Sequence, residues 1–419
     1  MARYAHITGW GMGLPQRVMT NDDWAQLVDT SDEWIRSRTG VVERRIAGEG
    51  ESTLTLSMEA ARQAIEVAGI SPAQLDLIIV GTLTPEYVIP STACLVQDGL
   101  GATRAAAFDL SAGCTGFIYG LSLAADSIRV GNYQHALVIG AETLSRVMDW
   151  TDRATCVLFA DGAGAVVVSG SETPGGVLSS VLGADGSGGD YLIVPAGGSK
   201  LPASHETVDQ GLHTIKMNGR EVFKFATRTM NKATRLACQK ANISLEDVNL
   251  VVPHQANHRI IQSAARSLKL PMERFVVNLD RYGNTSAATV PIALCEAIES
   301  GRVQRGDHLV LVAFGAGLTW GATVVKWGVP LPVVPTGWWR HVLQWLYYRW
   351  ARMRSVGARL RRRLEGWRPF RKNNDNQGHV PSPPPASREQ DAQLAESLAR
   401  TEPVAADEQT QVAESEESS

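Results

Sequence analysis

The chain has 419 residues, of which 44% are hydrophobic, 20% charged and 6% aromatic, a composition typical of a globular protein with roughly two to three domain-sized cores. Collagen-like, wholly disordered and disulfide-framework classes are excluded. The net charge of -3 produces no global field that would attract nucleic acid, and we expect no nucleic-acid partner.

The cysteine pattern and the hydropathy of the chain indicate the cellular compartment in which we expect the protein. The five cysteines form an odd set without CxxC or CxxH spacing, so we expect a reduced, cytoplasmic setting and no metal site. The first residues, MARYAHITGWGMGLP, lack a charged region followed by an apolar one, and no charge-free apolar run approaches the ~20 residues that span a bilayer. We therefore expect a soluble or peripheral protein, and no cofactor.

Short β-branched runs alternate with helical patterns from the start of the chain to about residue 329. The runs lie at residues 75–81, 105–110, 135–140, 248–253 and 308–314. Continuous apolar strands separated by helices indicate parallel strands covered on both faces. The sequence therefore predicts a layered α/β fold.

The two halves of this region resemble each other. GISPAQLDLIIV (69–80) and NISLEDVNLVVP (242–253) share one pattern, and each follows a predicted helix and precedes a polar strand end, another helix and a second strand. Duplication of one α/β unit is the simplest explanation. We expect halves at 1–172 and 173–329, with a cleft between them.

Cys114 lies in FDLSAGCTGF, where a predicted strand ends near Leu110 and a helix follows. Unpaired backbone N–H groups and the positive end of the helix dipole favour a thiolate there, so we expect a lowered thiol pKa and a nucleophile. The alternative is a buried packing residue, which is our interpretation of the other four cysteines.

Two polar residues occupy matching places in the second half. His254 follows the strand ending at Pro253, and Asn284 lies in a small-residue turn after Gly283. By the duplication, both residues and Cys114 lie at carboxyl ends of strands, where open α/β sheets place their sites. A lone strand-end His or turn Asn is usually structural, and their joint occurrence favours a site.

The segments AGCTGF, VPHQANHRI, YGNTSAATVP and FGAGLTWGA resemble the motifs of the β-ketoacyl-acyl-carrier-protein synthase III family, condensing enzymes of the thiolase superfamily. SDEWIRSRTGVVERR (31–45) and FADGAGAVVV (159–168) extend the resemblance to about residues 3–328. It implies a thiolase-like five-layered αβαβα fold and a homodimer. It also implies that an acyl-CoA primer condenses with malonyl-acyl-carrier protein, with loss of CO2, to initiate fatty-acid-type chain synthesis.

The resemblance assigns the catalytic roles. Cys114 would accept the acyl group, and His254 and Asn284 would donate hydrogen bonds to the malonyl thioester carbonyl. The oxyanion donors would be the backbone N–H groups of Cys114 and Ala316. Ala316 stands where the family usually has glycine, and a backbone donor survives that change if φ is negative.

The resemblance also implies binding residues for two substrates. CoA would be held by Trp34, Arg38 and Arg153, and the acidic carrier protein by Lys224, Arg259 and Arg266. Ile89 matches the place where the partner subunit closes the acyl pocket, often with an aromatic side chain. A smaller Ile would leave a longer or wider pocket, so the length of the primer stays open.

Beyond residue 329 the composition changes. Residues 338–372 contain ten Arg, one Lys and a single acid, with five of the chain's 11 Trp, whereas 373–419 carry ten acids and two Arg. We expect a basic amphipathic helix within 330–372 that lies on an anionic membrane surface, and a disordered acidic tail at 373–419. The alternative for the helix is docking on the protein body or on its dimer mate.

Two other functions stay open. The first is a thiolase-fold acyltransferase or condensing enzyme of specialised metabolism that uses another acceptor. The second is a membrane-recruited, non-catalytic scaffold. Asn284 favours the decarboxylating enzyme over the first alternative, and the complete set of Cys, His and Asn weighs against the second.

Overall fold

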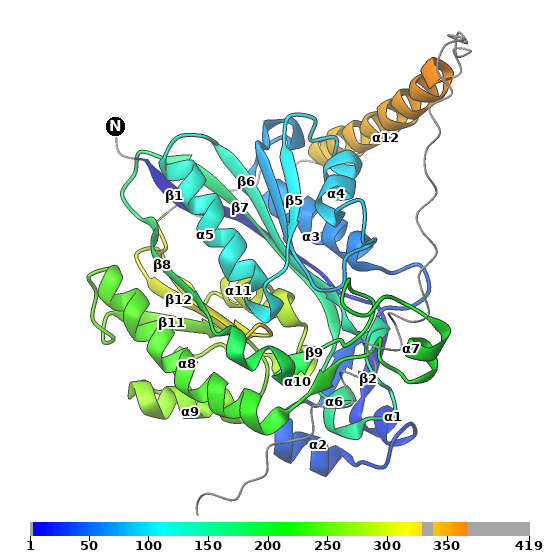
Figure 1. Ribbon diagram of the computed structural model, residues 1–419. Coiled ribbons are helices and arrows are strands. Elements are labelled where there is room, and N and C mark those ends of the chain that lie inside the picture. Colours follow the sequence, from blue (N-terminus) through cyan, green and yellow to red (C-terminus); the bar gives the residue numbers. More distant parts are fainter. Residues whose placement is uncertain (1–2, 329–337, 367–419) are drawn as a thin grey trace, which may run out of the picture. The chain divides into compact units, whose positions relative to one another are not determined.

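A computed structural model of the chain describes residues 3–328 and 338–366 (Figure 1). The chain divides into a compact unit, Met1–Arg362, and a second unit, Arg363–Ser419. The disordered tail predicted at 373–419 lies outside the described residues.

The first sheet contains five strands in the order β1-β7-β6-β4-β5. They are β1 (Tyr4–Gly13), β4 (Leu77–Gly81), β5 (Ala106–Leu110), β6 (His135–Thr143) and β7 (Asp161–Ser171). β4 runs parallel to both β5 and β6, whereas β7 is antiparallel to β6 and β1. The apolar runs at 75–81, 105–110 and 135–140 are β4, β5 and β6, so the parallel arrangement predicted from them is confirmed. β1 and β7 lie outside those runs.

The second sheet contains four strands in the order β11-β12-β13-β8. They are β8 (Gly176–Ala184), β11 (Val248–Pro253), β12 (His308–Gly315) and β13 (Thr319–Lys326). β11 and β12 are parallel, and the other pairs are antiparallel. Each sheet is thus built from one half of the sequence, and each has parallel strands that end at the same edge.

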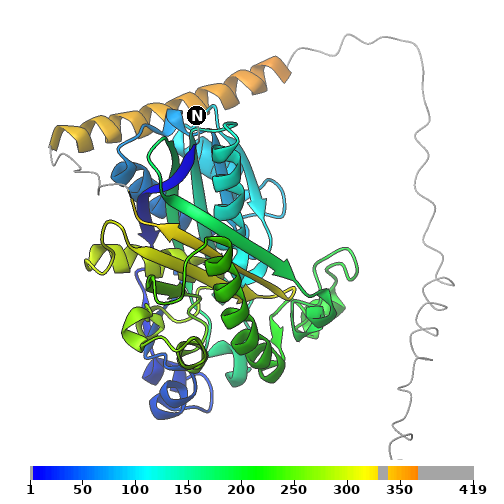
Figure 2. The same ribbon diagram turned by 90° about the vertical axis from the view of Figure 1, so that its left-hand side faces the viewer.

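Helices form three layers around these two sheets (Figures 1 and 2). α3 (Thr53–Ala68) and α4 (Thr92–Leu100) pack on the outer face of the first sheet. α5 (Gly116–Arg129) and α11 (Thr289–Glu299) are buried between the sheets. α8 (Gly219–Lys240) and α9 (His258–Leu268) cover the outer face of the second sheet. The order helix, sheet, helix, sheet, helix is the five-layered α/β architecture.

Local sequence explains where these helices begin and end. Ser52 and Thr55 form a capping box at the start of α3, and Gly69 ends the helix in the left-handed region. Asn218 and Asn257 cap α8 and α9 through their side-chain oxygens. The central helices are apolar on nearly all sides because both of their faces meet a sheet.

Shorter elements complete the unit. The strands are β2 (Val18–Thr20), β3 (Glu43–Arg45), β9 (Leu192–Ile193) and β10 (Lys216–Met217), and the helices are α1 (Asn21–Ala25), α2 (Asp32–Thr39), α6 (Arg153–Cys156), α7 (His205–Asp209) and α10 (Leu279–Tyr282). α12 (Trp338–Gly366) is a helix in the segment where the sequence predicts one. Within residues 3–328 and 338–366, helices that combine the length and the hydropathy required to cross a bilayer are absent.

Candidate active site

A cavity of about 490 Å³ opens where the carboxyl ends of strands from both sheets meet. Cys114, His254 and Asn284 all line it. The three residues come from different parts of the sequence and are each at least nine-tenths buried. The structure therefore brings the three predicted catalytic side chains into one cavity.

Cys114 lies in a single 3-10 turn, η2 (Gly113–Thr115), between the end of β5 and the start of α5. Its backbone presses against the end of β12: a Cβ atom added to Gly315 would lie 2.4 Å from the Cys114 nitrogen. On the other side, a Cβ atom on Gly113 would lie 2.7 Å from the Ala316 nitrogen. Only glycine allows this approach, which places the N–H groups of Cys114 and Ala316 in one neighbourhood.

The departure from glycine at position 316 leaves the backbone unstrained. Among the described non-glycine residues, positive φ occurs at Asn242, Lys269 and Ser286. Ala316 is not in this group, so the condition set for its N–H as a donor is met.

The environment of the Cys114 thiol differs from the prediction. Burial raises the pKa of Cys114 to about 12, a hydrogen bond with Ser286 lowers it, and the nearby Glu142 carboxylate raises it further. The expectation of a lowered pKa was based on the helix terminus and neglected desolvation, which is the largest effect here. The resting nucleophile is therefore a thiol rather than a thiolate.

His254 follows β11 and is held by its backbone and its ring. Its N–H donates to the Val312 carbonyl at 2.8 Å, and the ring meets Phe314 edge-on with centroids 5.1 Å apart. Its Nδ1 lies 2.7 Å from the Thr289 hydroxyl oxygen. Burial lowers the pKa of His254 to about 3, so the imidazole is neutral at physiological pH.

Asn284 is fixed on both sides of its backbone. Its N–H donates to the Leu158 carbonyl at 3.0 Å, and its carbonyl accepts from the Ala160 N–H at 2.9 Å. The N–H of Ser286 donates to the side-chain oxygen of Asn284 at 2.9 Å. This bond assigns the carboxamide orientation and leaves the Nδ2 amide as the donor toward the cavity.

Ser286 connects the polar groups of the site, and sequence reasoning missed it. Besides the bond to Asn284, its carbonyl accepts from the Thr289 hydroxyl at 2.9 Å, and its own hydroxyl donates to the Glu142 carboxylate at 3.1 Å. Ser286 lies in the 3-10 turn η6 (Ser286–Ala288), just before α11. The run of small hydroxyl residues NTSAAT was the available signal.

Glu142 is the second residue that sequence reasoning missed. It is completely buried near the end of β6, and its carboxylate accepts from the N–H groups of Leu83 and Thr84 and from the Thr84 hydroxyl. Burial raises the pKa of Glu142 to about 7 despite these bonds. The signal was a carboxylate at the end of an otherwise apolar strand, HALVIGAE, because such groups are rarely buried without a partner.

Aromatic and basic residues form the wall of the cavity toward α2. Trp34 and Arg38 line it, and the guanidinium groups of Arg38 and Arg153 each lie 5.5 Å from the Trp34 ring centre. Arg153 also pairs with Asp29 at 3.0 Å. The three predicted CoA contacts therefore lie together.

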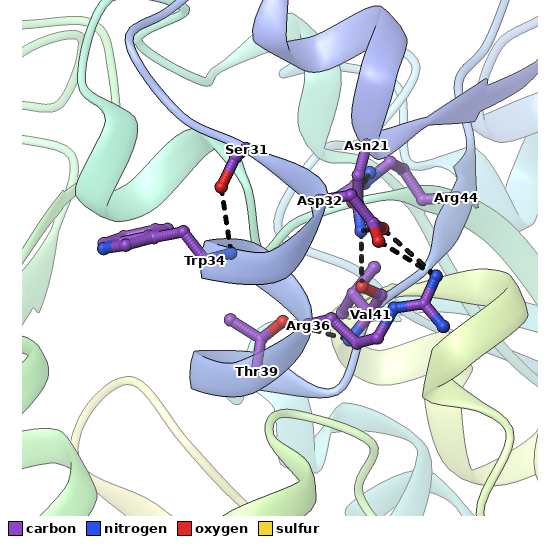
Figure 3. Close-up of polar contacts among 8 residues, drawn as sticks. All are labelled: Asn21, Ser31, Asp32, Trp34, Arg36, Thr39, Val41 and Arg44. Carbon is purple, nitrogen blue, oxygen red and sulfur yellow. Dashed lines mark hydrogen bonds and ion pairs between the residues drawn. The ribbon is translucent and has the colours of Figure 1, made fainter.

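A network of hydrogen bonds fixes α2 and so the position of Trp34. Ser31 caps the helix by accepting from the Trp34 N–H at 3.1 Å, and Asn21 donates to Asp32 and to the Val41 carbonyl, both at 2.8 Å (Figure 3). Figure 3 shows the Trp34 ring pointing away from this network. The ring thus lies on the cavity side of α2, where the Arg38 and Arg153 guanidinium groups lie over it.

The remaining predicted contacts divide into two groups. Lys224 and Arg259 line the cavity, whereas Arg266 lies farther along α9, in a separate hollow with Lys269. Ile89 lies outside this cavity, in the loop between β4 and α4, where its side chain is 86% exposed. Within the described residues, clusters of three or more His, Cys, Asp or Glu side chains able to hold a metal ion are absent.

Two family models match the chain. They are described as 3-oxoacyl-[acyl-carrier-protein (ACP)] synthase III, over residues 108–186, and as the C-terminal part of the same enzyme, over residues 238–327. The β-ketoacyl-[acyl-carrier-protein] synthase III of Symbiobacterium thermophilum is 58% identical over 322 residues, which are 77% of this chain and 98% of that protein. That of Caldanaerobacter subterraneus is 55% identical, with the same two shares.

Two solved structures also resemble the chain. The 3-oxoacyl-[acyl-carrier-protein] synthase III of Aquifex aeolicus has a TM-score of 0.72 and 49% identity, over 77% of this chain and 99% of that one. The priming β-ketosynthase of the R1128 polyketide pathway has a TM-score of 0.73 and 36% identity, over 78% and 98%. Both alignments leave more than a fifth of this chain unmatched.

Proposed function

We propose that this chain, which belongs to the β-ketoacyl-[acyl-carrier-protein] synthase III family of thiolase-fold acyltransferases, loads an acyl group from acyl-CoA on Cys114 and condenses it with malonyl-acyl-carrier protein. The observation that carries this proposal is the single cavity lined by the Cys114 thiol, the His254 imidazole and the Asn284 carboxamide. A neutral imidazole and an oriented carboxamide are donors suited to a developing enolate oxygen.

The first step transfers the acyl group. The Cys114 sulfur attacks the thioester carbon of acyl-CoA, and the CoA sulfur leaves with the proton that the thiol gives up. Because the thiol is protonated at rest, the S–H bond breaks as the new C–S bond forms. The N–H groups of Cys114 and Ala316 donate to the oxygen of the tetrahedral intermediate.

The second step forms the new carbon–carbon bond. The malonyl carboxylate leaves as CO2, and its electron pair passes to an enolate whose oxygen accepts hydrogen bonds from His254 Nε2 and Asn284 Nδ2. The enolate carbon attacks the acyl-Cys114 thioester, the bond between the acyl carbon and the Cys114 sulfur breaks, and the expelled sulfur takes up a proton from water. The products are 3-oxoacyl-acyl-carrier protein, CO2 and the free enzyme.

Thr289 decides whether His254 can donate in this step. The hydroxyl of Thr289 has one hydrogen and two acceptors within reach, the His254 Nδ1 at 2.7 Å and the Ser286 carbonyl at 2.9 Å. When Thr289 donates to Nδ1, the single proton of the neutral imidazole resides on Nε2. Donation from Nε2 therefore requires the Thr289 hydrogen to turn from the Ser286 carbonyl to the His254 Nδ1, and we propose Thr289 as a positioning residue for this donor form of His254.

Substrate docking follows from the rim of the cavity. Trp34 with the flanking Arg38 and Arg153 offers a stacking surface and positive charge for the CoA adenine and phosphates. Lys224 and Arg259 present positive charge at the cavity, and Arg266 lies two turns farther along α9 from Arg259. An acidic carrier protein would be steered to this face by charge.

A homodimer would complete the acyl pocket. Tyr87, Val88 and Ile89 form an exposed apolar loop, with Val88 93% exposed. The edge strand β5 beside it also exposes Phe108. An open strand edge and an apolar loop together suit a second copy of this chain, whose cavity Ile89 would enter.

A direct test of the reaction uses Cys114→Ala and Cys114→Ser. Wild-type protein incubated with radiolabelled acyl-CoA should retain label after precipitation, and neither variant should do so. Label that persists on both variants would show that another residue is acylated. Release of CO2 from malonyl-acyl-carrier protein separates the decarboxylating reaction from an acyltransferase that uses another acceptor.

A second proposed property is a cytoplasmic location with peripheral contact to a membrane. It is supported by α12, a basic helix rich in Trp that lies beyond the residues matched by the two family models. Flotation of the full chain with liposomes, compared with a chain that ends near residue 328, tests this contact. Equal flotation of both proteins, or of neither, would remove it.

A further inference from the structure

One face of α12 is docked on the body of the protein. The Tyr347 hydroxyl donates to the Gly101 carbonyl at 3.1 Å, and Ala351, only 2% exposed, packs directly above Gly101. One and two turns farther along, Ser355 and Arg359 both donate to the Asp98 carboxylate, at 2.7 and 2.8 Å. The spacing of four residues places all these contacts on one side of α12, against the end of α4.

The opposite side of α12 carries an apolar stripe. Leu346, Trp350, Met353 and Leu360 are between 49% and 66% exposed. At 100° per residue, Leu346, Met353 and Leu360 lie about 100–180° around the helix from Tyr347, Ala351 and Ser355. Trp350 lies at the edge of the stripe, with its ring centre 6.1 Å from that of Tyr347. The helix therefore has two functional faces, and its apolar face is the one that the protein body leaves uncovered.

Positive charge borders this stripe on both sides. Arg349 lies on one flank, and Arg354 and Arg361 lie on the other; all three are exposed. The Arg354 guanidinium lies over the Trp350 ring, 5.2 Å from its centre. Between Trp338 and Arg362 the sequence contains no acidic residue. Two such faces paired with each other would bring like charges together, whereas an anionic bilayer attracts both flanks while the stripe is buried.

We propose that the stripe formed by Leu346, Trp350, Met353 and Leu360 is the membrane-binding face of this protein, and that it inserts into the surface of an anionic lipid bilayer while Tyr347, Ala351, Ser355 and Arg359 hold the helix on α4. This inference rests on the membrane contact proposed above and adds the face and the lipid. α12 thus stays docked on the protein body while its apolar stripe is inserted in the bilayer.

This arrangement leaves the cavity accessible. Within the first unit, α12 lies beside α3 and α4, and the two views place α2 and α9 at the far end from it (Figures 1 and 2). α2 and α9 carry Trp34, Arg38 and Arg259 at the cavity. With the stripe on a bilayer, this end of the cavity would point toward the aqueous phase, where a carrier protein can reach it.

The test compares variants of the full chain by vesicle flotation. Vesicles of phosphatidylcholine alone are compared with vesicles that also contain phosphatidylglycerol. The double variant Trp350→Gln, Leu360→Gln should lose binding to the anionic vesicles by roughly tenfold for each large apolar side chain removed. Arg354→Gln should weaken binding by about fivefold, because one positive charge leaves the surface.

Two matched controls separate the stripe from general effects. Leu27→Gln changes a leucine on the body that is as exposed as Leu360, 54% against 53%, and should leave flotation unchanged. Asp98→Asn removes the ion pair with Arg359 and should also leave flotation unchanged, because the stripe is intact. Condensing activity with substrates in solution should be the same for all these variants.

The outcomes are distinguishable. Binding of the wild type that depends on phosphatidylglycerol and falls in the Trp350 and Leu360 variant supports the proposal. Absence of wild-type binding would overturn the membrane contact itself. Wild-type binding that survives the double variant, or equal binding to both vesicle types, would overturn the assignment of the face or the lipid. A change in oligomeric state of the double variant, measured by light scattering without vesicles, would show that a second copy covers the stripe.

Discussion

Replacing Thr289 with Val should impair decarboxylation while leaving acyl loading intact. Val has the shape of Thr without the hydroxyl, and Thr289 is 2% exposed. The His254 Nδ1, itself in a ring that is 1% exposed, would lose its partner at 2.7 Å. An unpaired buried polar atom costs about 1–3 kcal/mol, which corresponds to a fall of roughly 5- to 150-fold in a step that depends on it.

The assay separates the two half-reactions. Decarboxylation is measured as CO2 released from malonyl-acyl-carrier protein, and acyl loading as label retained from acyl-CoA. Thr289→Ser keeps the hydroxyl and should restore CO2 release. Equal loss in both half-reactions with normal folding, or no loss of CO2 release in Thr289→Val, would refute the argument that Thr289 selects the donor form of His254.

Three further predictions concern the surroundings of the site. Gly315→Ala places a Cβ atom 2.4 Å from the Cys114 nitrogen and should lower acyl loading by about 100-fold. The control Gly198→Ala, whose Cβ atom meets no other atom within 4 Å, should load normally. Normal loading by Gly315→Ala would contradict the close packing of Gly315 on Cys114. Burial raises the pKa of Glu142 from 4.5 to about 7, so folding favours the neutral form of this carboxyl group. Its contribution to the free energy of unfolding is complete below about pH 4.5 and is lost as the pH rises through about 7, a fall of roughly 3 kcal/mol. Urea unfolding across this range should show that fall in the wild type and not in Glu142→Gln, and an unchanged slope in the variant would assign it to another group. Ile89→Phe should reduce kcat/KM for long acyl-CoA primers by about tenfold or more relative to short ones, and the same chain-length profile as the wild type would place Ile89 outside the acyl pocket.

The layers of the fold could be predicted because their signals are local. Continuous apolar runs at 75–81 and 248–253 coincide with β4 and β11, and the helices predicted before them coincide with α3 and α8. The antiparallel pairing of β1 with β7 could not be predicted, because the pattern of apolar residues in a strand is the same whichever way the strand runs in the sheet. Strand direction depends on the route of the chain between strands, which periodicity does not record.

The candidate site shows a similar division. Cys114, His254 and Asn284 were identifiable because each follows a strand or a turn with its own sequence signal. Ser286 and Glu142 are joined by a hydrogen bond between residues 144 positions apart, and single-sequence patterns carry no signal for such a pair. The direction of the Cys114 pKa was wrong for the same reason, since burial by distant segments outweighs the local helix terminus.

The sequence offers two interpretations of α12, membrane binding and docking on the protein body, and each describes one face of the helix. Its spacing indicated one apolar and one basic face, and docking on the protein body was the alternative to membrane binding. The structure shows docking through Tyr347 and Ala351 and leaves the Trp350 side exposed, so the two interpretations apply to different faces. Sequence alone could not show this, because the contact with Asp98 joins residues far apart in the chain.

Mass spectrometry of an Asn284→Ala variant offered a mixture of acyl-CoA thioesters tests the catalytic assignment most directly. The assignment of Cys114 and Asn284 predicts a single acyl group on the peptide that contains Cys114, which persists when malonyl-acyl-carrier protein is added, while the wild type discharges it with one CO2 for each 3-oxoacyl product. An acyl group found on another residue, or discharge by the variant at the wild-type rate, would contradict it.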